Sequence, residues 1–213
     1  MKITILGSGS VATTLAAGFI ARGDSVMLGT RSAAKLADWQ AQHPQAQVGS
    51  VEQAAAFGEL AVLAVKGGAV SAVLRQAAAG LAGKVVIDAT NPIGDTPPVN
   101  GVLNFVTGPN QSLLEQLQRE QPALRLVKAF NSVGAHLMVK PQLAGGPPTM
   151  FICGNDAAAK ASVSKILDDF GWDTADMGGA EAARAIEPLC MLWCIPGLAH
   201  NQWRHAFKLL RPV

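Results

Sequence analysis

Short apolar runs alternate with helix-like segments along the chain. Lys2–Leu6 is apolar and β-branched and predicts a buried strand, followed by a small-residue helix over 11–20 and a second strand over Ser25–Gly29. The same alternation continues with strands over 58–65, 84–90 and 125–131 and helices over 69–81 and 112–121. Strands that alternate with helices predict an α/β fold built on a doubly wound, mainly parallel sheet.

The pattern beyond residue 132 predicts further elements on the same unit. Strands are expected over 150–153 and 173–177, with a helix over 156–170 between them and a helical tail over 181–210 that Pro196 and Gly197 interrupt. We therefore divide the chain into a core, 1–132, and additional strands with a short helical C-terminal extension, 133–213. Residues 91–111, rich in Pro, Gly and Asn, form a long connection of a kind that is uncommon unless it serves a site.

The corner between the first strand and the first helix reads GSGSVA at 7–12. This is the G-x-G-x-x-G/A pattern in its expected strand–turn–helix context, and it predicts a Rossmann-type dinucleotide site. Gly7 permits the turn, Gly9 lets a diphosphate approach the backbone, and the first amide groups of the helix face the anion. A plain structural turn is the alternative. The predicted contacts from this corner are Gly7, Ser8, Gly9, Ser10 and Val11.

The end of the second strand bears on the choice between NAD and NADP. NAD sites usually place an Asp or Glu there to hold the ribose hydroxyls. Here the strand ends in Thr30, Arg31 and Ser32, with Lys35 a turn later and no carboxylate. Two hydroxyls, a guanidinium and an ammonium suit the dianionic 2′-phosphate of NADP, although these residues could also be an ordinary solvated helix start.

The carboxyl ends of the next three strands carry small or amide-bearing residues, where a ligand of a doubly wound sheet is expected. A nicotinamide and its ribose fit such surfaces. The predicted cofactor contacts are Ala64, Val65, Lys66, Ala89, Asn91, Pro92 and Asn131. Alternatively, Asn91 and Pro92 merely open a turn and Asn131 caps a helix.

An acceptor pocket is expected between the tips at 66–68, 91–94 and 131–134. The tail around Met191, Leu192, Trp193 and Pro196 is expected to close one side of it. These large apolar residues could instead pack in the core or in a homodimer interface.

Composition excludes several classes of protein. The 213 residues carry a net charge of +2 and no Tyr, and the basic residues are dispersed, so nothing favours nucleic-acid binding. No apolar run is expected to reach the ~20 residues of a membrane span, so we expect a cytoplasmic protein. We separately expect it to be a homodimer. The three cysteines, Cys153, Cys190 and Cys194, lie in apolar settings and are expected to be reduced, with no metal site.

Five motifs in order give a resemblance that covers essentially the whole chain: GSGSVA at 7–12, GTRS at 29–32, DATNP at 88–92, VKAFNS at 127–132 and ARAIEPL at 183–189. Together they resemble the NADP oxidoreductase family that includes the NADPH:coenzyme F420 reductases and the cytosolic domain of the STEAP metalloreductases. The resemblance implies direct hydride transfer between NADP(H) and a deazaflavin or flavin as small-molecule acceptor, stacked ring to ring.

Such a transfer requires no catalytic acid or base, and none is evident at the strand tips. Two alternatives stay open: an NADP-dependent reductase of a small carbonyl or imine, and a non-catalytic module that senses NADP(H).

Overall fold

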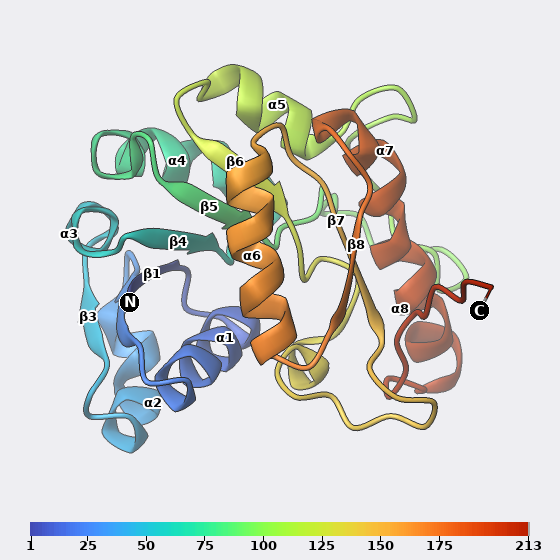
Figure 1. Ribbon diagram of the computed structural model, residues 1–213, viewed down its shortest axis with the longest axis horizontal. Helices are drawn as coiled ribbons and strands as arrows, with labels where there is room; N and C mark the ends of the chain where they lie inside the picture. The colour runs from blue at the N-terminus through green and yellow to red at the C-terminus, as the bar shows by residue number, and fades with distance from the viewer. Residues whose placement is uncertain (213) are drawn as a thin grey trace.

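A single parallel sheet organises the computed structural model, which describes residues 1–212 (Figure 1). Its strand order is β3-β2-β1-β4-β5-β6, so the direction of winding reverses between β1 and β4 at the centre. The strands are β1 (Lys2–Leu6), β2 (Ser25–Gly29), β3 (Gln47–Gly49), β4 (Leu60–Leu63), β5 (Val85–Asp88) and β6 (Arg125–Lys128). The predicted Rossmann-type α/β fold is confirmed.

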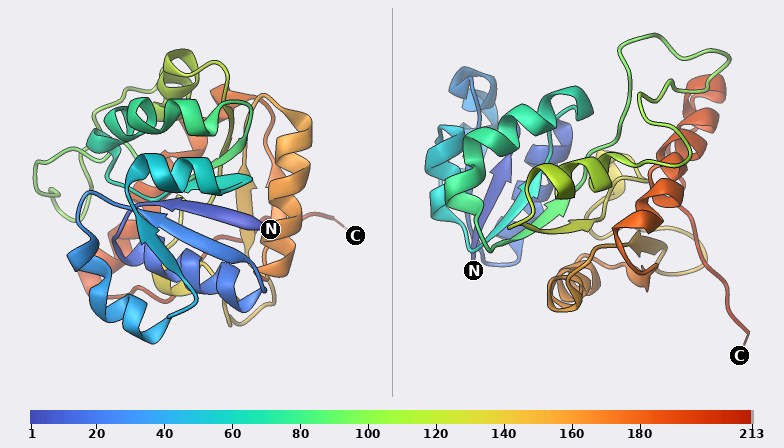
Figure 2. Two further views of the ribbon diagram at one scale, coloured as in Figure 1. Left: turned by 90° about the vertical axis from the view of Figure 1, so that its left-hand side faces the viewer. Right: turned by 90° about the horizontal axis from the view of Figure 1, so that it is seen from above.

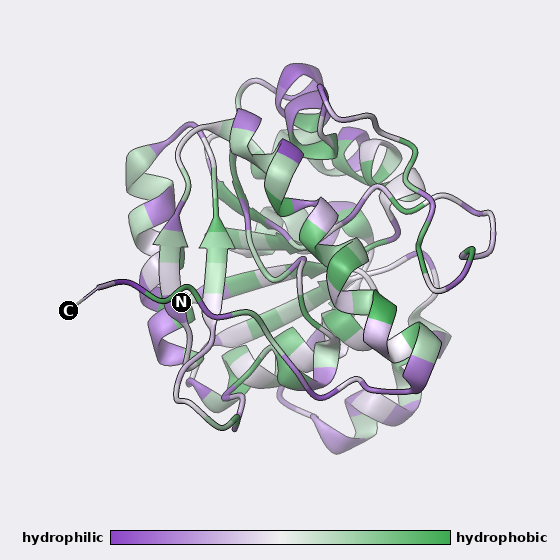
Figure 3. Cartoon of the chain, turned by 90° about the vertical axis from the view of Figure 1, so that its right-hand side faces the viewer, coloured by the Kyte–Doolittle hydropathy of each residue, from purple (hydrophilic) through white to green (hydrophobic). Residues whose placement is uncertain are grey.

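Helices cover both faces of this sheet because alternate strand residues point to opposite sides (Figure 2). Ile3, Ile5 and Val62 belong to one apolar core, with α1 (Ser10–Ala21) and α6 (Ala157–Asp169). Ala61 and Leu63 belong to the other, with α3 (Val51–Phe57), α4 (Gly67–Leu81) and α5 (Leu113–Glu120). A short helix, α2 (Ala37–Gln42), lies between β2 and β3. Figure 3 shows the resulting hydrophobic strands enclosed by helices of mixed hydropathy.

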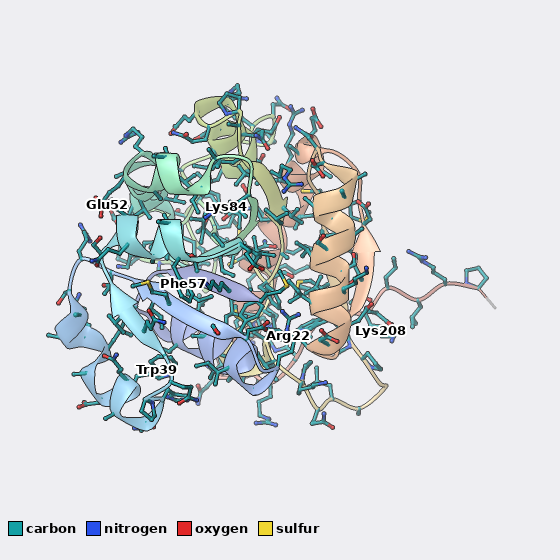
Figure 4. All side chains as sticks on the ribbon, turned by 60° about the vertical axis from the view of Figure 1, so that its left-hand side comes forward. Arg22, Trp39, Glu52, Phe57, Lys84 and Lys208 are labelled. Carbon is teal, nitrogen blue, oxygen red and sulfur yellow. The ribbon has the colours of Figure 1, made fainter. Side chains whose placement is uncertain are left out.

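The last third of the chain adds a second, two-stranded sheet beside β6. Strands β7 (Thr149–Ile152) and β8 (Asp173–Asp176) pair in parallel, and an antiparallel bridge joins Lys128 to Cys153. Arg22 and Lys208 form ion pairs here, Arg22 Nη1 with Asp169 Oδ2 at 3.2 Å and Lys208 Nζ with Asp173 Oδ2 at 2.9 Å (Figure 4).

The tail differs from the prediction of a helix over 181–210 that breaks at Pro196. A short turn (Ala180–Ala182) leads into α7 (Ala183–Ile186) and α8 (Pro188–His200), and α8 continues through Pro196. It ends at His200, where Asn201 takes a left-handed conformation with φ of 54° and donates its N–H to the Gly197 carbonyl at 2.9 Å. Residues 201–212 are not helical, and the Phe207 carbonyl accepts a hydrogen bond from the Thr149 N–H at 2.8 Å.

The helical run Ala180–His200, with 21 residues and a mean hydropathy of 1.2, is long and apolar enough by length and composition to cross a membrane. A run of this length was not predicted from the sequence. Within the fold, however, the run carries Glu187, whose carboxylate is buried and paired with Lys128 at 2.9 Å. The part of the run around Glu187 is therefore packed in this structure, whereas Leu192 and Leu198 farther along are exposed.

The long connection after β5 forms a small hairpin. Val99 and Val102 exchange backbone hydrogen bonds of 3.0 Å, and Asn100 and Gly101 between them have φ of 50° and 81°. Positive φ at both central residues is typical of a type I′ turn, for which Asn-Gly is favoured. Gly101 lies close to Ala199, so the hairpin lies against α8 (Figure 2).

Candidate active site

The glycine-rich corner has the geometry that its pattern predicts. Gly7 has a φ of 143°, donates its N–H to the Gly29 carbonyl at 3.0 Å, and passes so close to the Ala64 carbonyl that a Cβ would collide with it. A Cβ on Gly9, in contrast, would meet nothing within 4 Å. The backbone at Gly9 is therefore open to a ligand, and α1 begins here with no side-chain cap and no acidic residue in its first turn.

A cavity of about 340 Å³ opens in front of this corner. It is lined by Gly7, Ser8, Gly9, Gly29, Thr30, Arg31, Lys35, Val51, Ala64, Val65, Lys66, Ala69 and Val73. Its charged lining residues, Arg31, Lys35 and Lys66, are all cationic and exposed. A glycine-lined floor at a helix N-terminus with three cationic side chains fits a dinucleotide that carries an extra phosphate.

A second cavity, of about 480 Å³, adjoins the first and shares Val65, Lys66 and Ala69 with it. Its other lining residues are Gly67, Gly68, Ala89, Thr90, Asn91, Ile93, Gly94 and Asp95. The carboxyl ends of β4 and β5 and the long connection thus form one wall. The two cavities make a continuous cleft across the reversal of strand order, where doubly wound sheets bind their ligands.

Several predicted contacts do not line either cavity. Ser10 and Val11 lie in the first turn of α1, and Pro92 is buried. Ser32 is part-buried and donates its N–H to Thr30 Oγ1 at 3.2 Å. The first turn of α1 still presents its amide groups at the corner, so backbone contacts there stay a prediction.

Asn91 and Asn131 bind each other. Asn91 Nδ2 donates to the Asn131 carbonyl at 2.8 Å, and Asn131 Nδ2 donates to Asn91 Oδ1 at 3.1 Å and to the Ile186 carbonyl at 3.0 Å. Asn91 lines the second cavity, whereas Asn131 is 3% exposed and lies behind it. These hydrogen bonds hold the tips of β5 and β6 together and join them to α7.

Below these tips lies a buried charge cluster that was not predicted from the sequence as part of the site. Lys128 Nζ lies 2.7 Å from Asp88 Oδ2 and 2.9 Å from Glu187 Oε1, and it donates to the Thr90 carbonyl at 2.9 Å. Burial opposes the charge on Lys128, but the two carboxylates outweigh it and raise the pKa of the ammonium group. The available signal was a lysine directly after the apolar residues Leu126 and Val127 of a buried strand.

The tail does not close the second cavity as expected. Met191, Leu192, Trp193 and Pro196 line neither cavity. Trp193 is 6% exposed and packs within its own chain: its ring lies 5.1 Å from that of His205, and its Nε1 donates to the His205 carbonyl at 2.7 Å. Of the three loops predicted to form the acceptor pocket, those at 66–68 and 91–94 contribute lining residues and that at 131–134 does not.

The three cysteines are free, as predicted. Burial raises the pKa of the Cys153 thiol to about 12, so this group is not a ready nucleophile. Among residues 1–212, no group of three or more His, Cys, Asp or Glu side chains is arranged to hold a metal ion.

Comparison with known proteins decides the family. The profile of the NADP oxidoreductase, coenzyme F420-dependent, family matches residues 2–92, from β1 to the tip of β5. A solved structure from Arthrobacter sp. FB24, described as a putative F420-dependent NADP reductase, is 34% identical with a TM-score of 0.93, and the match covers 99% of this chain and 100% of that one. This chain belongs to the coenzyme F420-dependent NADP oxidoreductase family. It is an NADP-dependent oxidoreductase.

Two further relatives extend the comparison. Metalloreductase STEAP3 of Rattus norvegicus is 34% identical over 203 residues, which is 92% of this chain, and the chain spans 38% of the length of that relative. A reductive aminase from Aspergillus terreus, solved with NADPH and ethyl levulinate, is 21% identical with a TM-score of 0.66 over 94% of this chain and 62% of that one. The aminase shares the fold with this member of the NADP oxidoreductase family.

Proposed function

We propose that the protein transfers a hydride between NADPH and a deazaflavin or flavin. The observation that carries the proposal is the continuous cleft: one half is cationic and glycine-lined, and the other is formed by strand tips and the long connection. The relative from Arthrobacter supports a deazaflavin, since it is matched over its whole length and is described as a putative F420-dependent NADP reductase.

The first cavity would hold the adenosine and diphosphate half of the cofactor. Arg31 and Lys35 are the groups that would contact the 2′-phosphate, and the backbone at Gly9 and the first turn of α1 would contact the diphosphate. NADPH, when bound, supplies the hydride. The second cavity would take the nicotinamide and the acceptor ring, against Ala89, Ile93 and Gly94.

Proton transfer is not needed from the chain in this proposal. The titratable side chains that line the second cavity are Lys66 and Asp95, and both are exposed. A hydride that passes directly between two rings needs only that they be bound in contact and shielded from water. We therefore assign no catalytic acid or base, and the chain contributes binding and orientation.

The test is NADPH oxidation measured in parallel with flavin mononucleotide, flavin adenine dinucleotide, a deazaflavin and ferric chelates. The proposal predicts turnover with at least one flavin or deazaflavin. The ferric arm is included because the relative from Rattus norvegicus is named a metalloreductase. Turnover with ferric chelates alone, with an imine or ketone alone, or with no acceptor despite NADPH binding would overturn the proposal.

The Gly9→Val variant is the matched control for this assay. It adds a side chain where the structure leaves open space, so the fold is kept while the diphosphate position is filled. Any activity that this variant retains at the wild-type level does not come from the cleft.

A further inference from the structure

Lys128 is a fully enclosed charged side chain near the cleft, as is its partner Asp88. It has 0% exposure, on a strand that is apolar apart from its two ends. Its ammonium group has three hydrogens to donate, and three oxygens lie around it, from Asp88, Glu187 and the Thr90 carbonyl, at 2.7 Å, 2.9 Å and 2.9 Å. Every donor can therefore be used within the protein.

Two of these partners lead directly to the second cavity. Asp88 ends β5, and its Oδ1 accepts from the Thr90 N–H at 2.9 Å and from Thr90 Oγ1 at 2.6 Å. Thr90 and the neighbouring Ala89 and Asn91 line that cavity. Lys128 thus holds the β5 tip twice, through the Asp88 carboxylate and through the Thr90 carbonyl.

The third partner leads to the tail. Glu187, between α7 and α8, is 1% exposed and accepts from the Leu113 N–H at 2.9 Å and the Leu114 N–H at 3.0 Å, at the N-terminus of α5. The carboxylate therefore caps α5 while it pairs with Lys128. One ammonium group links the β5 tip, α5 and the helical tail.

Stability alone does not account for such a cluster. Removing a lysine and two carboxylates from water is costly, and well-packed apolar residues commonly stabilise a core equally well. The cluster has one positive and two negative charges, and the N–H groups of α5 offset only part of the excess. What a charged cluster adds is a fixed geometry, and the group whose geometry it fixes here is the wall of the second cavity.

We propose that Lys128 is a positioning residue for hydride transfer: it sets the β5 tip against the tail and so shapes the nicotinamide half of the cleft. This rests on the proposed function. Lys128 lines neither cavity, and it contacts the second one only from behind, through the Thr90 carbonyl. The adenosine half, built from the glycine-rich corner and Arg31, is independent of it.

The test compares two ligands in Lys128→Met. Adenosine 2′,5′-bisphosphate occupies only the adenosine half, whereas NADPH also occupies the nicotinamide half. We expect an unchanged dissociation constant for the bisphosphate and an NADPH affinity about tenfold weaker, because the wall that the nicotinamide contacts is displaced. Turnover should fall by about a hundredfold because a misplacement near 1 Å has that effect.

Lys84→Met is the matched control, since Lys84 is a part-buried lysine just before the opposite end of β5, where its Nζ donates to the Ala55 carbonyl at 2.8 Å (Figure 4). It should leave both affinities and turnover unchanged. Equal losses for the two ligands in Lys128→Met would show a merely structural role and overturn the proposal. So would no loss for either ligand.

A second variant keeps the test decisive if Lys128→Met does not fold. Lys128→Met combined with Glu187→Gln restores the formal charge of the cluster, and it should show the same selective loss of NADPH affinity. Equal binding changes for the two ligands would overturn the proposal here also. If the wild type binds NADPH but reduces no acceptor, the proposed function fails, while the ratio of the two affinities still tests Lys128.

Discussion

Arg31→Ala removes the side chain best placed to choose NADPH over NADH. Arg31 follows β2 at the cationic end of the first cavity, where an NAD site would carry a carboxylate. Hydrogen bonds to charged groups contribute roughly 1.5 to 3 kcal/mol. Arg31 is exposed, and solvent screens exposed charges, so we expect the lower end, about 1.5 kcal/mol, or a dissociation constant for NADPH about tenfold higher.

Isothermal titration calorimetry with NADPH and with NADH measures this effect. NADH lacks the 2′-phosphate, so its affinity should change little in the variant. The loss for NADPH should shrink as salt is added, because the contact lies at the surface. Arg75→Ala is the control for removal of one positive charge, since Arg75 is 65% exposed in its side chain and makes only a 3.8 Å pair with Glu120. Equal losses for NADPH and NADH, or an equal loss in Arg75→Ala, would refute the assignment of Arg31 to the 2′-phosphate.

Three further predictions follow from the geometry. Gly9→Val should reduce NADPH affinity by more than about a hundredfold with little change in melting temperature. Gly7→Val should lower the melting temperature itself, because a Cβ at that position has no room. A lower melting temperature for Gly9→Val and an unchanged one for Gly7→Val would contradict the corner geometry. Trp193→Ala should destabilise the fold by about 3 to 5 kcal/mol in chemical denaturation, and a selective loss of acceptor reduction without destabilisation would return Trp193 to the site. Arg184 donates two hydrogen bonds to the Glu115 carboxylate and, with hydrogen bonds from Ser112, holds the Glu115 pKa at about 2. The stability advantage of the wild type over Glu115→Gln should therefore be full above about pH 4.5 and decline as the pH falls toward 2. An advantage that does not change with pH in denaturation curves would contradict this role of the ion pair.

The sheet could be predicted from the sequence because its strands are buried on both faces and read as continuous apolar runs. The bounds of β1 and β2 match the prediction. The predicted ranges 58–65, 84–90 and 125–131 run past the ends of β4, β5 and β6. Each of these strands is followed by a small apolar residue, Ala64, Ala89 or Ala129. The sequence therefore does not show where the strand ends and the wall of the cleft begins.

Some elements were not predicted from the sequence because they are short. Strand β3 has only 3 residues and α3 only 7, too few for a clear period. A capping box was nevertheless available in the sequence, since Ser50 and Gln53 cap α3 reciprocally.

The site was predictable where one local motif defines it and less so where distant segments meet. The corner at 7–12 and the residues after β2 needed only their own sequence. The partners of Lys128 and Asn131 come from the β5 tip and from the end of α7 and the residue after it. Trp193 packs against His205 and Gly134. Helical periodicity shows that the tail has large apolar residues, but not which element they pack against.

The central claim is that NADPH transfers a hydride directly to the acceptor in this cleft. Its most direct test is single-turnover oxidation of NADPH with a deazaflavin as acceptor. Two forms of NADPH are compared, each deuterated at one of the two hydrogens on the carbon that donates the hydride. Because the two faces of a bound nicotinamide are not equivalent, the account predicts that one deuterated form alone slows oxidation and that its deuterium is found in the reduced acceptor. Equal rates for both forms, with no deuterium carried into the acceptor, would contradict it.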